Sequence, residues 1–152
     1  METVKALTAA ILLAITSVSF AERRIAKSDL PAPVRKTADA QSAGATVVGY
    51  SKDVERGKVE YEVQLMVDGH TKDVTIDPQG NLLDVEEQVQ PDALPANVLS
   101  GLRAQAGKGS ITKIESLMKH DKIVAYEAQV AAGKRHREIQ VGPDGKKLDH
   151  EE

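Results

Sequence analysis

Apolar and polar residues alternate along residues 59–67, near the middle of the chain. This period of two is typical of a strand that buries one face. Asp68-Gly69 interrupts the alternation and suits the positive φ angles of a type I′ turn. A second strand is therefore expected to return antiparallel through Val74 and Ile76, and the Asp-Pro-Gln-Gly turn at residues 77–80 follows it.

The segment before this hairpin predicts a helix and then a strand. Ser28 or Asp29 can cap the helix, and apolar side chains recur about every four residues from Leu30 onward. A first strand is expected at residues 45–51, because valines and a tyrosine are concentrated there. After the hairpin, residues 82–83 predict a short final strand.

The same order of elements begins again about sixty-four residues later. Residues 30–32 and 94–96 are both Leu-Pro-Ala, and seven of the 24 pairs between residues 61–84 and 126–149 are identical. Unrelated segments of this composition would share fewer, so the pattern predicts an internal duplication. The expected fold class is α+β, with two tandem repeats, each one helix packed on an antiparallel sheet of three to four strands. The two sheets either join or pack together.

The domain prediction places the repeats at residues 28–89 and 90–152, after a flexible leader at 22–27. Residues 1–21 predict a signal peptide, because an apolar run follows Lys5 and small residues end at Ala21. The run is shorter than the roughly 20 residues of a membrane span. We therefore expect cleavage, a periplasmic or secreted protein, and no stable membrane insertion afterwards; an uncleaved anchor is the alternative.

Composition narrows the partners and the chemistry. The net charge of −3 is too small to indicate nucleic-acid binding, and the absence of cysteine excludes disulfides and thiolate chemistry. Aromatic residues make up only 3% of the chain, so an aliphatic core is expected. Tyr61 and Tyr126 occupy equivalent positions and are predicted to fill the space between sheet and helix.

A family resemblance follows from the order of these motifs. In the first half they are Leu30-Pro31, Tyr61-Glu62, Asp68-Gly69 and Asp77-Pro78-Gln79-Gly80; in the second they are Leu94-Pro95, Tyr126-Glu127 and Gly142-Pro143-Asp144-Gly145. The chain resembles a tandem pair of PepSY domains, and its architecture is similar to that of secreted β-lactamase inhibitor proteins. The resemblance implies an exported, non-catalytic module, since PepSY domains occur in propeptides of secreted metallopeptidases and are thought to restrain them.

The motifs that usually mark catalysis or cofactor binding are not found in the sequence. No serine has a Gly-x-Ser-x-Gly context, and the glycines at residues 107–109 lack the spacing of a phosphate-binding loop. Residues 77–81 lack the alternating oxygen ligands of a calcium loop. We therefore predict no catalytic residue, no cofactor and no metal ligand.

Four histidines support an alternative hypothesis. They are His70, His120, His136 and His150, and each has a carboxylate nearby in the sequence. Imidazole and carboxylate groups together can bind divalent metals. If these clusters converged in space, the chain would be a periplasmic domain that senses a metal or small ligand.

The favoured hypothesis is a non-catalytic module that binds protein through a sheet edge or a sheet face. The partner is expected to be a peptidase or another envelope protein, restrained or docked by this chain, and the oligomeric state stays open. Polar positions of the two hairpins and a basic run at one hairpin tip form the candidate surface. These residues are Glu60, Glu62, Gln64, Glu127, Gln129, Lys134, Arg135 and Arg137.

Overall fold

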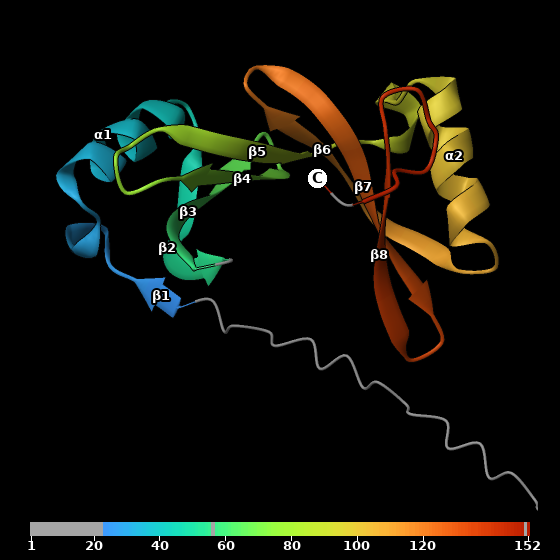
Figure 1. Ribbon diagram of the computed structural model, residues 1–152, viewed down its shortest axis with the longest axis horizontal. Helices are drawn as coiled ribbons and strands as arrows, with labels where there is room; N and C mark the ends of the chain where they lie inside the picture. The colour runs from blue at the N-terminus through green and yellow to red at the C-terminus, as the bar shows by residue number, and fades with distance from the viewer. Residues whose placement is uncertain (1–22, 56, 151) are drawn as a thin grey trace, which may run out of the picture.

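A computed structural model describes residues 23–55, 57–150 and 152. Two helices and eight strands make up most of this part of the chain (Figure 1). The first half contains β1 (Arg23–Ile25), α1 (Ala32–Gln41), β2 (Thr46–Glu55), β3 (Lys58–Val67), β4 (His70–Ile76) and β5 (Leu82–Gln88). The second half contains α2 (Ala96–Ala106), β6 (Ser110–Lys119), β7 (Lys122–Ala132) and β8 (Arg135–Val141). A short 3₁₀ turn precedes each helix, at Lys27–Asp29 and Pro91–Ala93.

All eight strands belong to one antiparallel sheet, in the order of the chain. The prediction of two tandem repeats, each with its own sheet of three to four strands, is therefore wrong. β5 pairs with β6, from Val85 opposite Met118 to Gln88 opposite Glu115, and this pairing joins the two halves. The physical reason is that two separate sheets would each leave an edge of unpaired N–H and C=O groups, which edge-to-edge pairing satisfies.

Two hydrophobic clusters lie on one face of this sheet. α1 covers a cluster built around Leu30, Val34 and Tyr61, and α2 covers one built around Val98 and Tyr126. All five are buried, as is Leu94, and the predicted packing of Tyr61 and Tyr126 between sheet and helix is confirmed.

The two helices lie at opposite ends of the molecule (Figure 1). Ile114 of β6 belongs to the cluster under α2, whereas Met118 of the same strand packs against the cluster under α1. Residues four apart on a strand point to one face. Both clusters and the helices that cover them therefore lie on one face, and among the described residues no helix lies on the opposite face.

Two hairpins close with turns of two residues, and the sequence predicts only the first of these turns. Asp68 and Gly69 both have positive φ, 49° and 86°, and Val67 pairs with His70, which confirms the predicted two-residue turn. The turn between β6 and β7 is formed by His120 and Asp121, whose φ angles are also positive. The sequence indicates only a loop there.

Three local expectations need correction. The expected flexible leader contains β1, which pairs with β2 through Arg24 and Ser51. Neither Ser28 nor Asp29 caps α1, because the helix begins only after Pro31. β5 extends to Gln88 and is a full strand. The predicted signal peptide at residues 1–21 lies outside the described residues.

Candidate functional site: the helix-free face

The helix-free face presents polar side chains on the strands from β3 to β8. Val63, Val74 and Val85 face the helices and lie opposite one another on β3, β4 and β5. Their neighbours along each strand must point the other way. The polar residues of the helix-free face include Glu62, Gln64, Asp73, Thr75, Asp84, Glu86, Gln88, Lys113, Glu115, Glu127, Gln129, Glu138 and Gln140.

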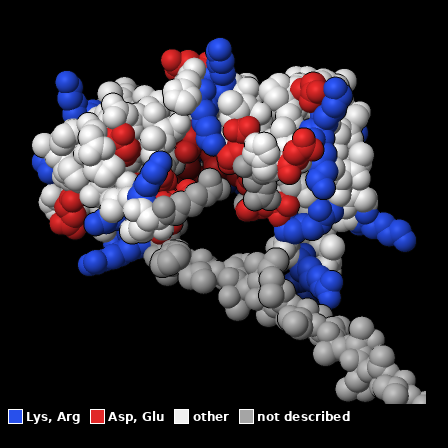
Figure 2. Space-filling model, in the orientation of Figure 1, with Lys and Arg blue, Asp and Glu red and all other residues white. Residues whose placement is uncertain are grey.

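An open groove of about 700 Å³ runs across this face. Figure 2 shows acidic side chains gathered around a hollow near the middle of the molecule. We call this hollow the acidic groove. Nine carboxylates line it, against two lysines and one histidine. The carboxylates are Asp53, Glu55, Glu60, Glu62, Asp84, Glu86, Glu127, Glu138 and Glu152; the basic residues are Lys58, Lys119 and His120.

Carboxylates lie opposite one another at the centre of the face. Asp73 and Glu86 are cross-strand partners on β4 and β5, and Glu115 and Glu127 are partners on β6 and β7. Carboxylate oxygens of Asp73, Glu86 and Glu115 lie within 4.8 Å of one another. Like charges placed directly opposite destabilise a sheet. Stability alone does not account for this arrangement.

Glu86 is the residue most affected by this crowding. Burial raises its pKa to about 7, and the negative charges of Glu127, Glu115, Asp84 and Asp73 contribute further. Both burial and nearby like charge disfavour the ionised form of a carboxyl group. Glu86 therefore exchanges its proton near neutral pH.

Two other groove carboxyl groups have pKa values above their ordinary range. Burial raises the pKa of Asp84, although a hydrogen bond with Thr75 and the charge of Lys119 oppose the effect. Burial also raises the pKa of Glu60, with support from the charges of Glu55 and Asp84. Burial in the groove, supported by neighbouring negative charges, thus disfavours the ionised form of both groups.

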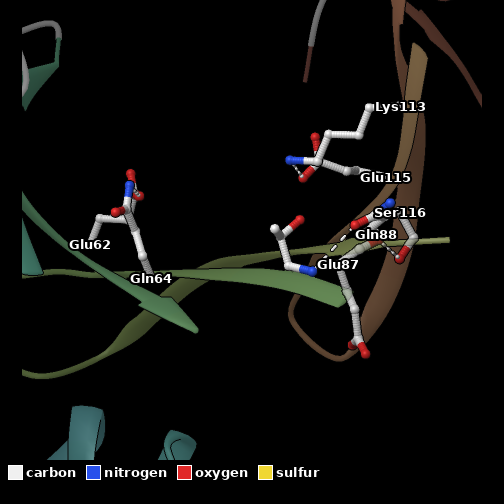
Figure 3. A network of polar contacts seen from close by, with 8 residues as sticks. Glu62, Gln64, Glu87, Gln88, Lys113, Glu115 and Ser116 are labelled. Carbon is white, nitrogen blue, oxygen red and sulfur yellow. Dashed lines mark hydrogen bonds and ion pairs between the residues drawn. The ribbon is translucent and has the colours of Figure 1, made fainter. Parts of the chain in front are cut away.

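Amide and ammonium groups hold several of these carboxylates in place. Gln64 Nε2 donates to Glu62 Oε1 at 2.9 Å, and Gln140 Nε2 donates to Glu127 Oε2 at 2.8 Å. Lys113 Nζ lies 2.6 Å from an oxygen of Glu115, whose side chain is nearly fully buried. Figure 3 shows Glu62, Gln64, Lys113 and Glu115 on one side of the sheet, whereas Glu87 points to the other.

The structure separates the predicted surface into two groups. Glu60, Glu62 and Glu127 line the acidic groove, and Gln64 and Gln129 lie on the same face beside them.

The basic residues do not belong to that face. Arg137 donates hydrogen bonds to the carbonyl oxygens of Gln105 and Ala106, at 2.6 and 3.2 Å, at the end of α2. Arg135 shares its orientation on β8, and Lys134 lies in the turn before it. Arg137 therefore stabilises the carboxyl end of a helix, where a positive charge is favourable.

Several carboxylates of the acidic groove, and one beside it, were not among the surface residues predicted from the sequence. Asp84 and Glu86 lie on β5, Asp53 and Glu55 on β2, and Glu115 lies beside them on β6. A signal was present in β5, where acidic residues alternate around Val85. Only the pairing of β5 with β6 brings the carboxylates of the two halves together.

The four histidines do not converge. His120 lines the acidic groove, His150 lies in a separate small hollow beside Gln105 and Asp149, and His70 and His136 are on other strands. Within the described residues, the group with metal-ligand spacing is Asp73, Glu86 and Glu115, which includes no histidine. The arrangement therefore does not provide the His–carboxylate cluster that the metal-sensing alternative requires.

Solved structures with the same fold come from Bacteroides. A protein of Bacteroides eggerthii DSM 20697 described as periplasmic matches with a TM-score of 0.63 at 16% identity, over 78% of this chain and 85% of that chain. A DUF2874 family protein of Bacteroides ovatus ATCC 8483 has a TM-score of 0.62 at 16% identity, over 78% and 84% of the two chains. A BLIP-like protein of Bacteroides fragilis NCTC 9343 has a TM-score of 0.57 at 20% identity, over 78% and 83%.

These likenesses show a shared fold. The sequence matches no protein-family model and no curated protein, so the PepSY resemblance stays a prediction. Among the described residues, neither helix is long and apolar enough to cross a membrane.

Proposed function

We propose that this chain is an exported, non-catalytic binding module that contacts a protein of the cell envelope through its helix-free face. The observation that carries the proposal is the acidic groove, an open hollow of about 700 Å³ on the sheet face that neither helix of the described residues covers. Proteins expose such continuous, shaped and charged surfaces where they meet partners. The groove spans strands of both halves, so the whole sheet presents it.

The face suits this role better than either edge of the sheet. β1, at one edge, has only three residues, and β8, at the other, carries the exposed charged residues Arg135, Arg137 and Glu138. Short edge strands and charged side chains are the features by which proteins discourage strand addition. Pairing with an extended peptide at an edge is therefore the weaker of the two modes considered from sequence.

The comparisons support export and protein binding. Three neighbours of the same fold come from bacterial species; one is described as periplasmic and another as BLIP-like. The signal-peptide pattern at residues 1–21 agrees with a periplasmic location. Restraint of a peptidase, which the PepSY resemblance implies, is the specific form of protein binding that we favour.

Site-specific photo-cross-linking in cells that export the full chain tests the proposal. A photoreactive amino acid at Glu60 or Glu138 would face the groove, whereas the same residue at Lys36 or Arg103 would lie on the exposed side of a helix. We expect a discrete adduct with an envelope protein from the two groove positions and none from the helix positions. Adducts of equal yield at all four positions, or none at the groove positions, would contradict the proposal.

A matched variant strengthens the experiment. Replacing Gln129 by Ala changes the helix-free face near the groove without altering charge, and replacing Gln41 by Ala makes the same change on α1. Adduct formation from Glu138 should fall with the first substitution only. Circular dichroism of both variants establishes that the fold is retained.

A further inference from the structure

The charge of this protein is distributed very unevenly. The whole chain carries a net charge of only −3, with 23 acidic and 20 basic side chains. The acidic groove alone contains nine carboxylates and two lysines. The remaining surface therefore carries more positive than negative charge, and the negative potential is focused in one hollow.

The size of the groove and the apolar side chains in its lining suit long, positively charged side chains. Its volume of about 700 Å³ falls in the range of pockets that enclose an organic ligand, and it far exceeds the space of a single ion. Leu83 and Leu117 lie among the carboxylates in its lining. Apolar surface beside carboxylates matches the structure of lysine and arginine, whose aliphatic stems pack while the charged ends pair.

The groove carboxylates, apart from Glu152 at the end of the chain, are distributed over strands across the sheet. They are contributed by β2, β3, β5, β7 and β8. β4 and β6 lie between these strands and contribute no groove carboxylate, so the carboxylates span several strand spacings of about 4.8 Å each, and one extended segment can meet several of them. A single small cation would contact only a few of these carboxylates.

We propose that the acidic groove receives a basic segment of the partner protein, whose lysine or arginine side chains pair with the groove carboxylates. This inference rests on the proposed function and names the chemistry of its partner. Charge complementarity selects this occupant, because a basic segment would neutralise the groove carboxylates, which outnumber the groove lysines by nine to two. Burial first, and then the charges of Glu127 and Glu115, raise the pKa of Glu86 to about 7, which agrees with a crowding of negative charge at the groove.

A divalent cation is the competing occupant. Asp73, Glu86 and Glu115 have oxygens within 4.8 Å of one another, but Lys113 already pairs with Glu115. Of these three residues, only Glu86 lines the groove. A cation bound at this position would not contact the other groove carboxylates. A basic segment would contact several of them, so it explains more of the groove.

Fluorescence anisotropy of the purified full chain tests the inference with a defined probe, a labelled 12-residue peptide of four Lys-Gly-Arg repeats. The variant Glu60→Gln/Asp84→Asn/Glu138→Gln removes three groove charges. The control variant Asp39→Asn/Asp68→Asn/Asp92→Asn removes three exposed charges outside the groove. At low salt we expect the groove variant to bind the peptide at least about tenfold more weakly and the control to stay within about twofold of the wild type.

Further measurements decide between the occupants. A peptide with glutamate in place of every basic residue should not bind, and affinity for the basic peptide should fall as salt is raised from about 20 to 200 mM. Equal binding by the groove variant and the wild type would overturn the inference. Micromolar binding of Ca²⁺ by calorimetry together with no peptide binding would overturn it in favour of a cation site.

The outcome is distinguishable from failure of the proposed function. If groove positions cross-link to an envelope protein while the basic peptide does not bind, protein binding stands and the basic partner is wrong. If the peptide binds through the groove while no groove position cross-links in cells, the charge inference stands and the envelope partner is wrong.

Discussion

Glu86 occupies the centre of the sheet with carboxylates on both neighbouring strands. It faces Asp73 on β4, and Glu115 and Glu127 lie beyond it on β6 and β7. An apolar or amide side chain there would avoid both the desolvation of a charge and the repulsion between neighbours. The carboxylate cluster therefore lowers the stability of the fold, and such a loss is common where a surface serves binding.

The variant Glu86→Gln should make the protein more stable at pH 8 and leave its stability at pH 4 unchanged. The pKa of Glu86 rises from an ordinary 4.5 to about 7 on folding, so the folded state binds more protons between these values. Wild-type stability contributed by this group therefore falls as pH rises from 4.5 to 7 and stays low above 7. Glutamine carries no charge and removes that loss. The free energy of unfolding at pH 8 should therefore rise by about 1–2 kcal/mol, after allowing for solvent screening of the partly exposed side chain.

Urea unfolding across pH 4 to 8 measures this effect. Glu87→Gln is the matched control, because Glu87 lies on the same strand and points to the other side of the sheet (Figure 3). Its stability should follow the wild-type profile. A Glu86→Gln variant that is no more stable than the wild type at pH 8 would show that neither burial nor the neighbouring carboxylates penalise the ionised form of Glu86.

At Gly145 the turn after β8 packs so closely against α2 that there is no room for a side chain. Its φ is +77°, and an added Cβ would lie 2.2 Å from the carbonyl oxygen of Asn97 on α2. Gly145→Ala should therefore destabilise the protein by roughly 2–4 kcal/mol, through backbone strain and a forced separation of turn and helix. Gly133 also has positive φ, +63°, but its Cβ would meet open space.

The control Gly133→Ala should cost only about 1 kcal/mol, the effect of the backbone conformation alone. Thermal or chemical unfolding of the two variants gives the comparison. Equal losses would mean that the contact between the turn and α2 contributes nothing to stability.

At the scale of elements, local sequence signals predict strands and turns well and predict pairing between distant strands poorly. The alternation of β3 and the Asp68-Gly69 turn are local and were correctly anticipated, as was the burial of Tyr61. The extension of β5 and its pairing with β6 were not, because the choice between two sheets and one depends on edges that no local pattern describes. The part of the acidic groove contributed by Glu60, Glu62 and Glu127 was therefore predicted, and the central part was missed.

α2 and the strands under it depend on Tyr126. The ring is 8% exposed and belongs to the cluster that α2 covers. Tyr126→Ala should lower the free energy of unfolding by about 3–5 kcal/mol, because it removes a large aromatic group and leaves a cavity. Urea denaturation followed by circular dichroism measures the loss.

Tyr126→Phe serves as the control for that substitution. It keeps the ring and removes only the hydroxyl group, so its effect should be about 1 kcal/mol or less. A Tyr126→Ala variant within 1 kcal/mol of the wild type would place the side chain outside the core that supports α2.

At the scale of the whole molecule, one continuous sheet carries two hydrophobic clusters on one face and the acidic groove on the other. The clusters anchor the sheet at its two ends, under α1 and α2. The groove crosses the junction between the halves, where β5 meets β6. Its shape therefore depends on that junction more than on either helix.

Hydrogen exchange of the backbone amides tests the continuity of the sheet. If β5 and β6 are paired, peptides covering residues 82–88 and 110–119 should exchange as slowly as the interior strand β3, since their N–H groups are bonded within the sheet. The amide of Val89 donates to the carbonyl oxygen of Ile114 at 2.9 Å, which extends the protection beyond the end of β5. The edge strands β1 and β8 provide the internal reference and should exchange faster. Exchange of β5 and β6 at the rate of these edges would mean that the two halves are separate in solution, and the acidic groove would then lose the floor on which its carboxylates meet.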